Sequence, residues 1–331
     1  MAILGILLFF CLSSVVTSQS QVLNIRDNGK ICSQWFNAQP GVSVSFTQNR
    51  ECISAVSFES QNGKSRLCCQ GMPLTTPSAN FPRECGRQKY QPHKTRIIGG
   101  FHANANSWPW QILLRGTNNQ CGGALIDQQH VLTAAHCLKF PVQAQDYKVY
   151  IGAHAIDKPM YMEQEIVAKQ IWAHELYNDK TLVNDIAIIR LSKPVQISDT
   201  VNFICLPGSE VGTAVNQTVW VSGWGRTAHL GDQSPILKQT WLHTMGNRCN
   251  TYGTASFNQE KQICAGRYTK DSSTCQGDSG GPLMFESSNG QWFINGVVSY
   301  GSTTCGTEGN PGVYTRVKYY LPWIESKLKA A

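Results

Sequence analysis

Three short segments hold side chains that could together carry out nucleophilic acyl transfer. A serine hydroxyl is a weak nucleophile at neutral pH, so it needs a base to take its proton and a third group to orient that base. Ser279, His136 and Asp185 are of the types that fill these roles. The segments that contain them are 134–137, 184–187 and 277–282, which read AAHC, NDIA and GDSGGP. The sequence therefore predicts a nucleophile at Ser279, held on a glycine-rich turn.

The elements that must position these residues are short strands. From residue 97 onward, runs rich in Val, Ile, Trp and Tyr alternate with turns rich in Gly, Asn and Asp. Many short strands of this kind are typical of a β-barrel or a β-sandwich. One helix is expected near the C-terminus, because apolar residues recur at helical spacing within 319–329. The expected strands include 110–114, 149–152, 186–191, 219–223 and 294–300.

The chain order His, Asp, Ser and the segment RIIGG at 96–100 together resemble the chymotrypsin-like (trypsin-fold) serine proteases. The resemblance covers residues 97 to about 328. It implies an all-β domain over 97–331, made of two six-stranded antiparallel β-barrels with a C-terminal helix and the active site in the cleft between them. It also implies a serine endopeptidase (a hydrolase) that works through an acyl-enzyme and needs no cofactor.

The resemblance assigns roles to the matching residues. Ser279 would attack the scissile carbonyl, His136 would move the proton, and Asp185 would hold the His136 tautomer. The backbone N–H groups of Gly277 and Ser279 would form the oxyanion hole. Ser299 matches the strand that lines the substrate backbone and supports the buried aspartate.

Arg96 and Ile97 carry the expected regulation. In this family, cleavage after the basic residue creates a new α-ammonium group, which inserts beside the acid that precedes the nucleophile, here Asp278. A buried ion pair is stabilising only when both partners are present. We therefore expect a zymogen whose oxyanion turn is malformed until the bond after Arg96 is cut.

By resemblance, Ser273 lies at the base of the primary specificity pocket, and Gly301 and Gly312 form its walls. A basic side chain would bury its charge there without a partner, which is costly. We therefore expect cleavage after Phe, Tyr, Leu or Met, and activation by a separate trypsin-like protease. An alternative remains open, because Asp271 or Glu308 could reach the pocket and restore a preference for Arg or Lys.

Cysteine usage indicates an oxidising compartment. Of the thirteen cysteines, Cys11 lies in the apolar N-terminal run, which leaves an even number for disulfides. The pair Cys85–Cys205 resembles the bond that keeps a light chain attached after activation. The other pairs that the resemblance implies for the protease domain are Cys121–Cys137, Cys249–Cys264 and Cys275–Cys305.

Residues 19–70 form a separate module that is too small to bury a sufficient core without covalent staples. The module resembles a clip domain, which precedes proteases in arthropod haemolymph cascades. Clip domains have six cysteines, and this segment has four. The bonds expected from this resemblance are Cys32–Cys68 and Cys52–Cys69, and an unrelated stapled module is the alternative. Residues 71–96 contain four prolines and are expected to be a linker and activation segment.

Residues 1–18 are expected to be a secretory signal peptide, because their apolar run is too short to span a bilayer and small residues follow it. The expected protein is therefore secreted and extracellular. Asn216, in the triplet NQT, is the expected N-glycosylation site. The net charge of +7 is spread along the chain, so neither nucleic acid nor a membrane is an expected partner. No metal is expected, since Ala153 and Met160 replace two carboxylates of the family's calcium loop.

The expected partners are protein substrates, an activating trypsin-like protease and a macromolecular inhibitor. They would act in an extracellular proteolytic cascade, for example in innate immunity. The competing hypothesis is a binding or regulatory protein that acts through the clip-like module and does not need catalysis. The presence of Ser279, Gly277 and Asp185 weighs against this hypothesis.

Overall fold

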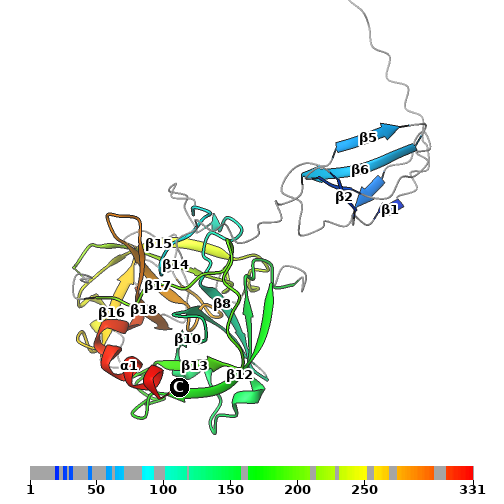
Figure 1. The fold of residues 1–331 in the computed structure, drawn as a ribbon. Helices are drawn as coiled ribbons and strands as arrows, with labels where there is room; N and C mark the ends of the chain where they lie inside the picture. Colours follow the sequence, from blue (N-terminus) through cyan, green and yellow to red (C-terminus); the bar gives the residue numbers. More distant parts are fainter. Residues whose placement is uncertain are drawn as a thin grey trace, which may run out of the picture. The chain divides into compact units, whose positions relative to one another are not determined.

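The structure is a computed structural model of the full chain, which divides into two compact units, Met1–Thr76 and Pro77–Ala331 (Figure 1). In the second unit it describes residues 84–92, 101–117, 119–157, 163–208, 214–227, 231–251, 257–267, 274–301 and 311–330. In the first unit it describes the backbone of six short strands. Among the described residues, no helix has the length and apolar content needed to cross a membrane.

The first unit contains two small sheets. Strands β1 (Gln19–Gln21) and β4 (Val44–Phe46) pair in parallel. The other sheet is antiparallel, in the order β2 (Ile25–Asp27), β3 (Lys30–Cys32), β6 (Lys64–Gln70) and β5 (Ser57–Gln61). Its register sets the Cα of Cys32 opposite that of Cys68, a spacing compatible with a disulfide. The bond between them stays a prediction, and Cys52 lies outside the described residues.

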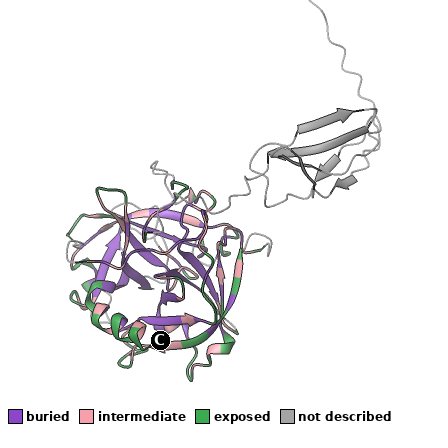
Figure 2. Cartoon of the chain, viewed as in Figure 1, coloured by how far each residue is buried: buried purple, intermediate pink, exposed green. Residues whose placement is uncertain are grey.

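Six antiparallel strands of the second unit close into a first barrel, in the order β10-β13-β12-β11-β8-β9. Val, Ile and Leu dominate these strands, and β8 and β10 are buried on both faces. Figure 2 shows the buried residues along these strands. The strands are β8 (Gln111–Arg115), β9 (Gln120–Leu125), β10 (His130–Thr133), β11 (Lys148–Ile151), β12 (Gln164–Ala173) and β13 (Ala187–Leu191).

A second barrel closes because β14 pairs with both β17 and β15, in the order β14-β17-β18-β19-β16-β15. A short strand, β7 (Phe101–His102), adds to β15. The predicted pair of six-stranded barrels is confirmed. The strands are β14 (Thr218–Gly223), β15 (Lys238–Thr244), β16 (Gln262–Gly266), β17 (Pro282–Glu286), β18 (Trp292–Tyr300) and β19 (Gly312–Arg316).

The predicted C-terminal helix is also confirmed, as α1 (Leu321–Lys329). Ile324 is its buried residue, and Trp323 donates from Nε1 to Glu175 at 2.9 Å. The short 3₁₀ helices are η1 (Ala135–Cys137), η2 (Ala144–Asp146), η4 (Arg248–Thr251) and η5 (Val317–Tyr320).

A cluster of tryptophans joins the cores of the two barrels. The ring centroid of Trp108 lies 4.8 Å from that of Trp292 and 6.2 Å from that of Trp220. Trp110, just before β8, is fully buried and donates from Nε1 to the sulfur of Met284 on β17. Such aromatic pairs contribute beyond their buried area. Side chains from β14, β17 and β18 of the second barrel therefore pack into the core of the first barrel, beside a separate apolar cluster inside the second.

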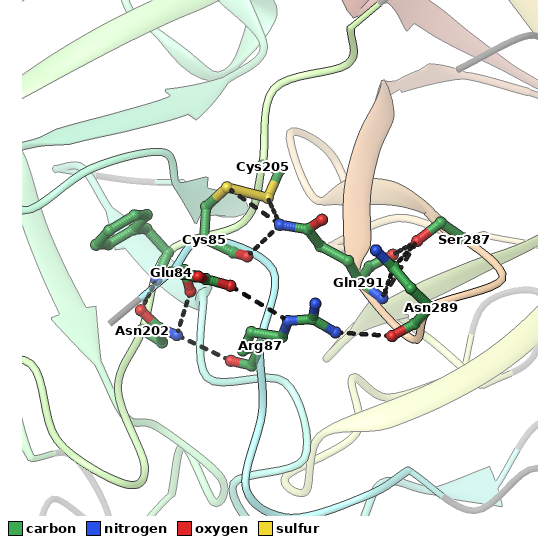
Figure 3. Close-up of a disulfide and its surroundings, with 9 residues drawn as sticks. Glu84, Cys85, Arg87, Asn202, Cys205, Ser287, Asn289 and Gln291 are labelled. Carbon is green, nitrogen blue, oxygen red and sulfur yellow. Dashed lines mark hydrogen bonds and ion pairs between the residues drawn. A yellow bond between two sulfur atoms is a disulfide. The ribbon is translucent and has the colours of Figure 1, made fainter. Parts of the chain in front are cut away.

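Residues 84–92, which were predicted to be part of the linker, instead belong to the second unit and bond to its barrels. A disulfide joins Cys85 to Cys205, and Gln291 donates from Nε2 to the carbonyl of Cys85 at 3.1 Å (Figure 3). The backbone of Gly86 donates to Phe203 at 2.8 Å and accepts from Trp292 at 3.0 Å. The disulfide and the hydrogen bonds at Cys85 and Gly86 therefore hold this tether segment, residues 84–92, in place.

Gly86 should be intolerant of a side chain. Its φ is +68°, and a Cβ would lie 2.2 Å from the carbonyl oxygen of Trp292. Gly290 has a similar φ of +74°, but its nearest neighbour would be a flexible Arg87 nitrogen at 4.0 Å. We expect Gly290→Ala to lower the free energy of unfolding by about 1–2 kcal/mol through the φ angle alone. Gly86→Ala should cost at least about 2 kcal/mol more, because backbone must also move.

Denaturant unfolding followed by tryptophan fluorescence measures both variants, since every tryptophan except Trp35 lies in the second unit. Equal losses in the two variants would show that the tether is not packed as described.

Candidate active site

His136 and Asp185 meet at one end of the first barrel. The register of β10 and β13 pairs Thr133 with Ala187, so the residues just outside both strands lie at the same end. Asp185 is fully buried. One of its carboxylate oxygens lies 2.7 Å from His136 Nδ1, and the other accepts from the His136 backbone N–H at 2.9 Å. The carboxylate therefore fixes both the ring and the backbone of the histidine.

The second barrel supplies two more hydrogen bonds to Asp185. Ser299 on β18 donates from Oγ to the carboxylate at 2.5 Å. Thr315 on β19 donates from Oγ1 to the Asp185 backbone carbonyl at 2.7 Å. The aspartate therefore spans the interface of the two barrels.

Asn184 orients the residue that follows it. It has a φ of +58°, a conformation that asparagine tolerates better than most residues. Its side-chain amide donates to the Leu176 carbonyl at 2.7 Å. Its oxygen accepts from Tyr320 Oη at 3.0 Å and from Lys261 Nζ at 3.2 Å. These bonds hold the backbone turn that directs Asp185 inward.

The pKa of His136 reflects two opposing effects. Burial disfavours the imidazolium, but the charge of Asp185 and the hydrogen bond to it favour the imidazolium more strongly. The pKa of His136 is therefore raised above its ordinary value of 6.5. A base with a raised pKa takes a proton more readily, as proton transfer from a serine requires.

Ser279 lies on a turn that packs against the first barrel. Gly122 on β9 donates its N–H to the Ser279 carbonyl at 2.7 Å. Gly277 and Gly280 have φ values of +100° and +77°, so the turn requires glycine at both positions. A Cβ on Gly280 would also lie 2.3 Å from Thr133 Oγ1.

The backbone N–H groups of Gly277 and Ser279 donate to no other group among the described residues. Within this part of the chain, no other acceptor therefore occupies these two N–H groups, as the predicted oxyanion hole requires. Within the same residues, Ser279 Oγ and His136 Nε2 do not form a hydrogen bond with each other. Catalytic hydrogen bonds of this kind often form or shorten only when substrate binds.

Asp278 is held in a cradle of backbone. Its two carboxylate oxygens accept from the N–H groups of Gly225, at 2.8 Å, and Cys275, at 2.9 Å. A Cβ on Gly223 would lie 2.1 Å from this carboxylate, and one on Gly225 would lie 2.5 Å away. Burial raises the pKa of Asp278 to about 6. No cation contacts it among the described residues, and Arg96 and Ile97 lie outside them.

Comparison with known proteins agrees with this geometry. The model of the trypsin family, described as "Trypsin", matches residues 97–324. This chain belongs to the trypsin family of chymotrypsin-like serine endopeptidases.

Two relatives show how far the likeness extends. Transmembrane protease serine 11C of Mus musculus is 38% identical over 248 residues, which are 73% of this chain and 56% of that protein. Chymotrypsin-C of Bos taurus is 35% identical over 277 residues, which are 78% of this chain and 99% of that protein. The chain thus spans just over half of the first relative and nearly all of the second.

In this trypsin-family chain, the two predicted pocket-wall glycines lie side by side. A Cβ on Gly301 would be 3.6 Å from the Cα of Gly312. A Cβ on Gly312 would meet Tyr314 Oη at 3.0 Å, so a side chain there would be crowded. Ser273, Asp271 and Glu308 lie outside the described residues.

Disulfides join Cys121 to Cys137 and Cys249 to Cys264. Cys275 is also disulfide-bonded, but its predicted partner Cys305 lies outside the described residues. Cys121, Cys137 and His136 form a group whose ligand-type atoms lie within 4.8 Å of one another. Because both sulfurs are in the disulfide, the group offers no thiolate to a metal.

Sequence reasoning missed Thr315, Asn184, Gly223 and Gly225 as supports of the site. The segment SGWG at 222–225 was the available signal, since two glycines around a tryptophan indicate close approach by another group. The sequence around Thr315 gives no indication of its role, because that role depends on how the two barrels pack together.

The activity should fall in acid as His136 takes up a proton. Because the folded-state pKa is raised, kcat/KM should decline through a midpoint above 6.5. In Asp185→Asn the midpoint should move down, since burial then acts without the opposing charge, and kcat should fall about 10⁴-fold. Ser299→Ala keeps the charge of Asp185, so its midpoint should stay above 6.5.

The pH dependence of peptide hydrolysis by the three proteins measures this. An unchanged midpoint in Asp185→Asn would show that another group controls the acid limb.

Proposed function

We propose that this chain is a secreted zymogen of a serine endopeptidase, which hydrolyses protein substrates once it is cut after Arg96. The observation that carries the proposal is the buried Asp185 carboxylate, which lies 2.7 Å from His136 Nδ1. The backbone N–H groups of Gly277 and Ser279 donate to no group among the described residues. The match of the trypsin-family model over 97–324 supports the same reaction.

In the proposed reaction, Ser279 Oγ attacks the scissile carbonyl carbon while His136 Nε2 takes the hydroxyl proton. Negative charge develops on the carbonyl oxygen, and the N–H groups of Gly277 and Ser279 stabilise it. The imidazolium is stabilised by Asp185 and returns the proton to the leaving amine. Water then attacks the acyl-enzyme by the same route and releases the second product.

Asp278 is the proposed control point. In the proposed active state, the new α-ammonium of Ile97 pairs with the Asp278 carboxylate. The two backbone N–H groups that donate to this carboxylate are already in place. An amine has an ordinary pKa of about 7.7–8.0, and pairing with a carboxylate raises it. The pair is therefore intact below the ordinary amine pKa and is lost as pH rises through the raised value. Activity should fall at alkaline pH for this reason.

Activation should depend on the Asp278 carboxylate. Trypsin should cut the purified chain after Arg96 and raise its peptidase activity at least about 100-fold, the cost of a malformed oxyanion hole. Asp278→Asn should be cut equally well but stay inactive, whereas Asp232→Asn, in an exposed loop, should activate normally. N-terminal sequencing must show Ile97 in every case. Normal activation of Asp278→Asn would disprove the proposed switch.

We further propose that the primary pocket takes large apolar side chains. Gly301 and Gly312, the proposed walls of that pocket, carry no side chains that could block it. Ser273, the residue expected at the pocket base, has no charge to pair with a buried cation. The likeness to a protein named chymotrypsin-C also favours an apolar preference.

Paired peptide substrates with Phe or Arg before the scissile bond test this preference. After trypsin activation and removal, Phe should be preferred by at least about 100-fold, a ratio that burial of an unpaired charge readily supplies. Ser279→Ala, treated identically, is the control, because any peptide hydrolysis in that sample would come from residual trypsin. A preference for Arg would implicate Asp271 or Glu308 instead. Silence on both substrates would favour the competing hypothesis of a binding protein that acts through the N-terminal module.

The wider setting of the enzyme is also a proposal. The apolar run within 1–18 and the disulfides of the second unit support secretion. The four cysteines of 19–70 support a clip-like module, with Cys32–Cys68 and Cys52–Cys69 bonded. We propose that the enzyme acts in an extracellular cascade, with an upstream trypsin-like activator and a macromolecular inhibitor as partners.

A further inference from the structure

We propose that Asn216 carries an N-linked glycan on a rigid turn far from the catalytic residues. The inference rests on the proposed secretion, because this modification is made in the secretory pathway. Asn216-Gln217-Thr218 fits the acceptor pattern, which in secreted proteins marks surface loops. The pattern alone does not show whether the asparagine is accessible in the fold, and the structure supplies that evidence.

The side chain of Asn216 is exposed and unengaged. Residues 214–216 are all exposed, and Thr218 is exposed at the start of β14. Among the described residues, the Asn216 amide makes no hydrogen bond to any group. The nitrogen that would bear the sugar is therefore free, and the folded protein can carry a bulky substituent there without loss of a contact.

The backbone of the same turn is firmly held. Asn216 donates its N–H to the Thr244 carbonyl at 2.7 Å, and Gln217 donates to Thr244 Oγ1 at 2.9 Å. Asn216 has a φ of +66°, which asparagine adopts several times more often than most residues. Thr244 thus fixes the backbone of the turn, while the Asn216 side chain bonds to no group among the described residues. The glycan would therefore be attached to a firmly held backbone.

The chemistry requires a donor of one class, an oligosaccharide linked to a lipid pyrophosphate. The amide nitrogen Nδ2 of Asn216 forms a bond to the anomeric carbon of the sugar. The bond from that carbon to the pyrophosphate oxygen breaks, and the lipid pyrophosphate leaves with the electron pair. The nitrogen loses one proton, so the product is a neutral secondary amide and the charge of the protein is unchanged.

The location predicts what the glycan does and does not affect. Val215 is 65% exposed, and a sugar on its neighbour would shield this apolar side chain. At the other end of β14, Gly223 contacts Asp278. The six residues of β14 span about 20 Å at the usual rise of a strand. The glycan should therefore leave hydrolysis of small peptides unchanged.

The test compares three full-length chains made in a eukaryotic secretory host: wild type, Thr218→Ala and Thr218→Ser. Thr218→Ala removes the acceptor hydroxyl but keeps Asn216, whose replacement would strain the turn. Thr218→Ser keeps the acceptor pattern and serves as the matched control. Medium and cell extract are both collected and treated with peptide-N-glycosidase in ¹⁸O-labelled water. Mass spectrometry then reads the peptide that contains residue 216.

Conversion of residue 216 to labelled aspartate in wild type and Thr218→Ser, but not in Thr218→Ala, is the expected result. After activation, kcat/KM for a small peptide should agree within about twofold between wild type and Thr218→Ala. Protein in the medium with unlabelled Asn216 would disprove the proposed glycosylation but would be consistent with the proposed secretion. Protein found only in the cell extract with unlabelled Asn216 would disprove both the proposed glycosylation and the proposed secretion. A labelled residue 216 in wild type, together with a large difference in kcat/KM between wild type and Thr218→Ala, would disprove the claim that the glycan lies far from the catalytic residues.

Discussion

The structure depends above all on a carboxylate that is buried with its charge. Asp185 is fully buried, and moving an ionised carboxylate out of water costs several kcal/mol unless donors surround it. Two donors come from His136 in the first barrel, and Ser299 donates from the second. Thr315, also from the second barrel, binds the backbone of the same residue. Because these donors lie on both barrels, the charge is satisfied only when the barrels are docked.

Asp278 offers a contrast with Asp185 within one active site. The Asp278 carboxylate accepts two backbone hydrogen bonds. The Asp185 carboxylate accepts from the His136 backbone and from Ser299, and it also faces an imidazole that can carry a positive charge. Without such a partner among the described residues, burial raises the pKa of Asp278 to about 6. The carboxylate lies so close to Gly223 and Gly225 that neither position has room for a side chain. Under the proposed switch, the α-ammonium of Ile97 would supply a positive charge opposite Asp278.

The apolar runs and the turns between them predicted short strands and the C-terminal helix, because these features leave local signals. The pair of six-stranded barrels and the roles of the site residues came from the family resemblance. The glycines beside Ser279 indicate a turn that needs positive φ values. Short apolar runs between turns indicate strands. Thr315 and Gly225 were not predicted, since they become parts of the site only through packing of elements far apart in the chain. The same holds for β7, whose two residues have no pattern of their own and are ordered by pairing with β15.

The tether segment shows how a cut chain can remain one molecule. Before cleavage, the Cys85–Cys205 disulfide closes a loop with a sequence separation of 120, which stabilises the fold by about 5 kcal/mol in the chain-entropy model. Cleavage after Arg96 would open that loop, so this entropic contribution would be lost. The disulfide would then act as a link between two chains, which keeps the tether at a high effective concentration. The bonds of Gly86 and Gln291 would hold it against the start of β18, the strand that ends at Ser299 and Tyr300. Under the proposed activation, residues 84–92 would therefore stay docked on the second barrel after the cut.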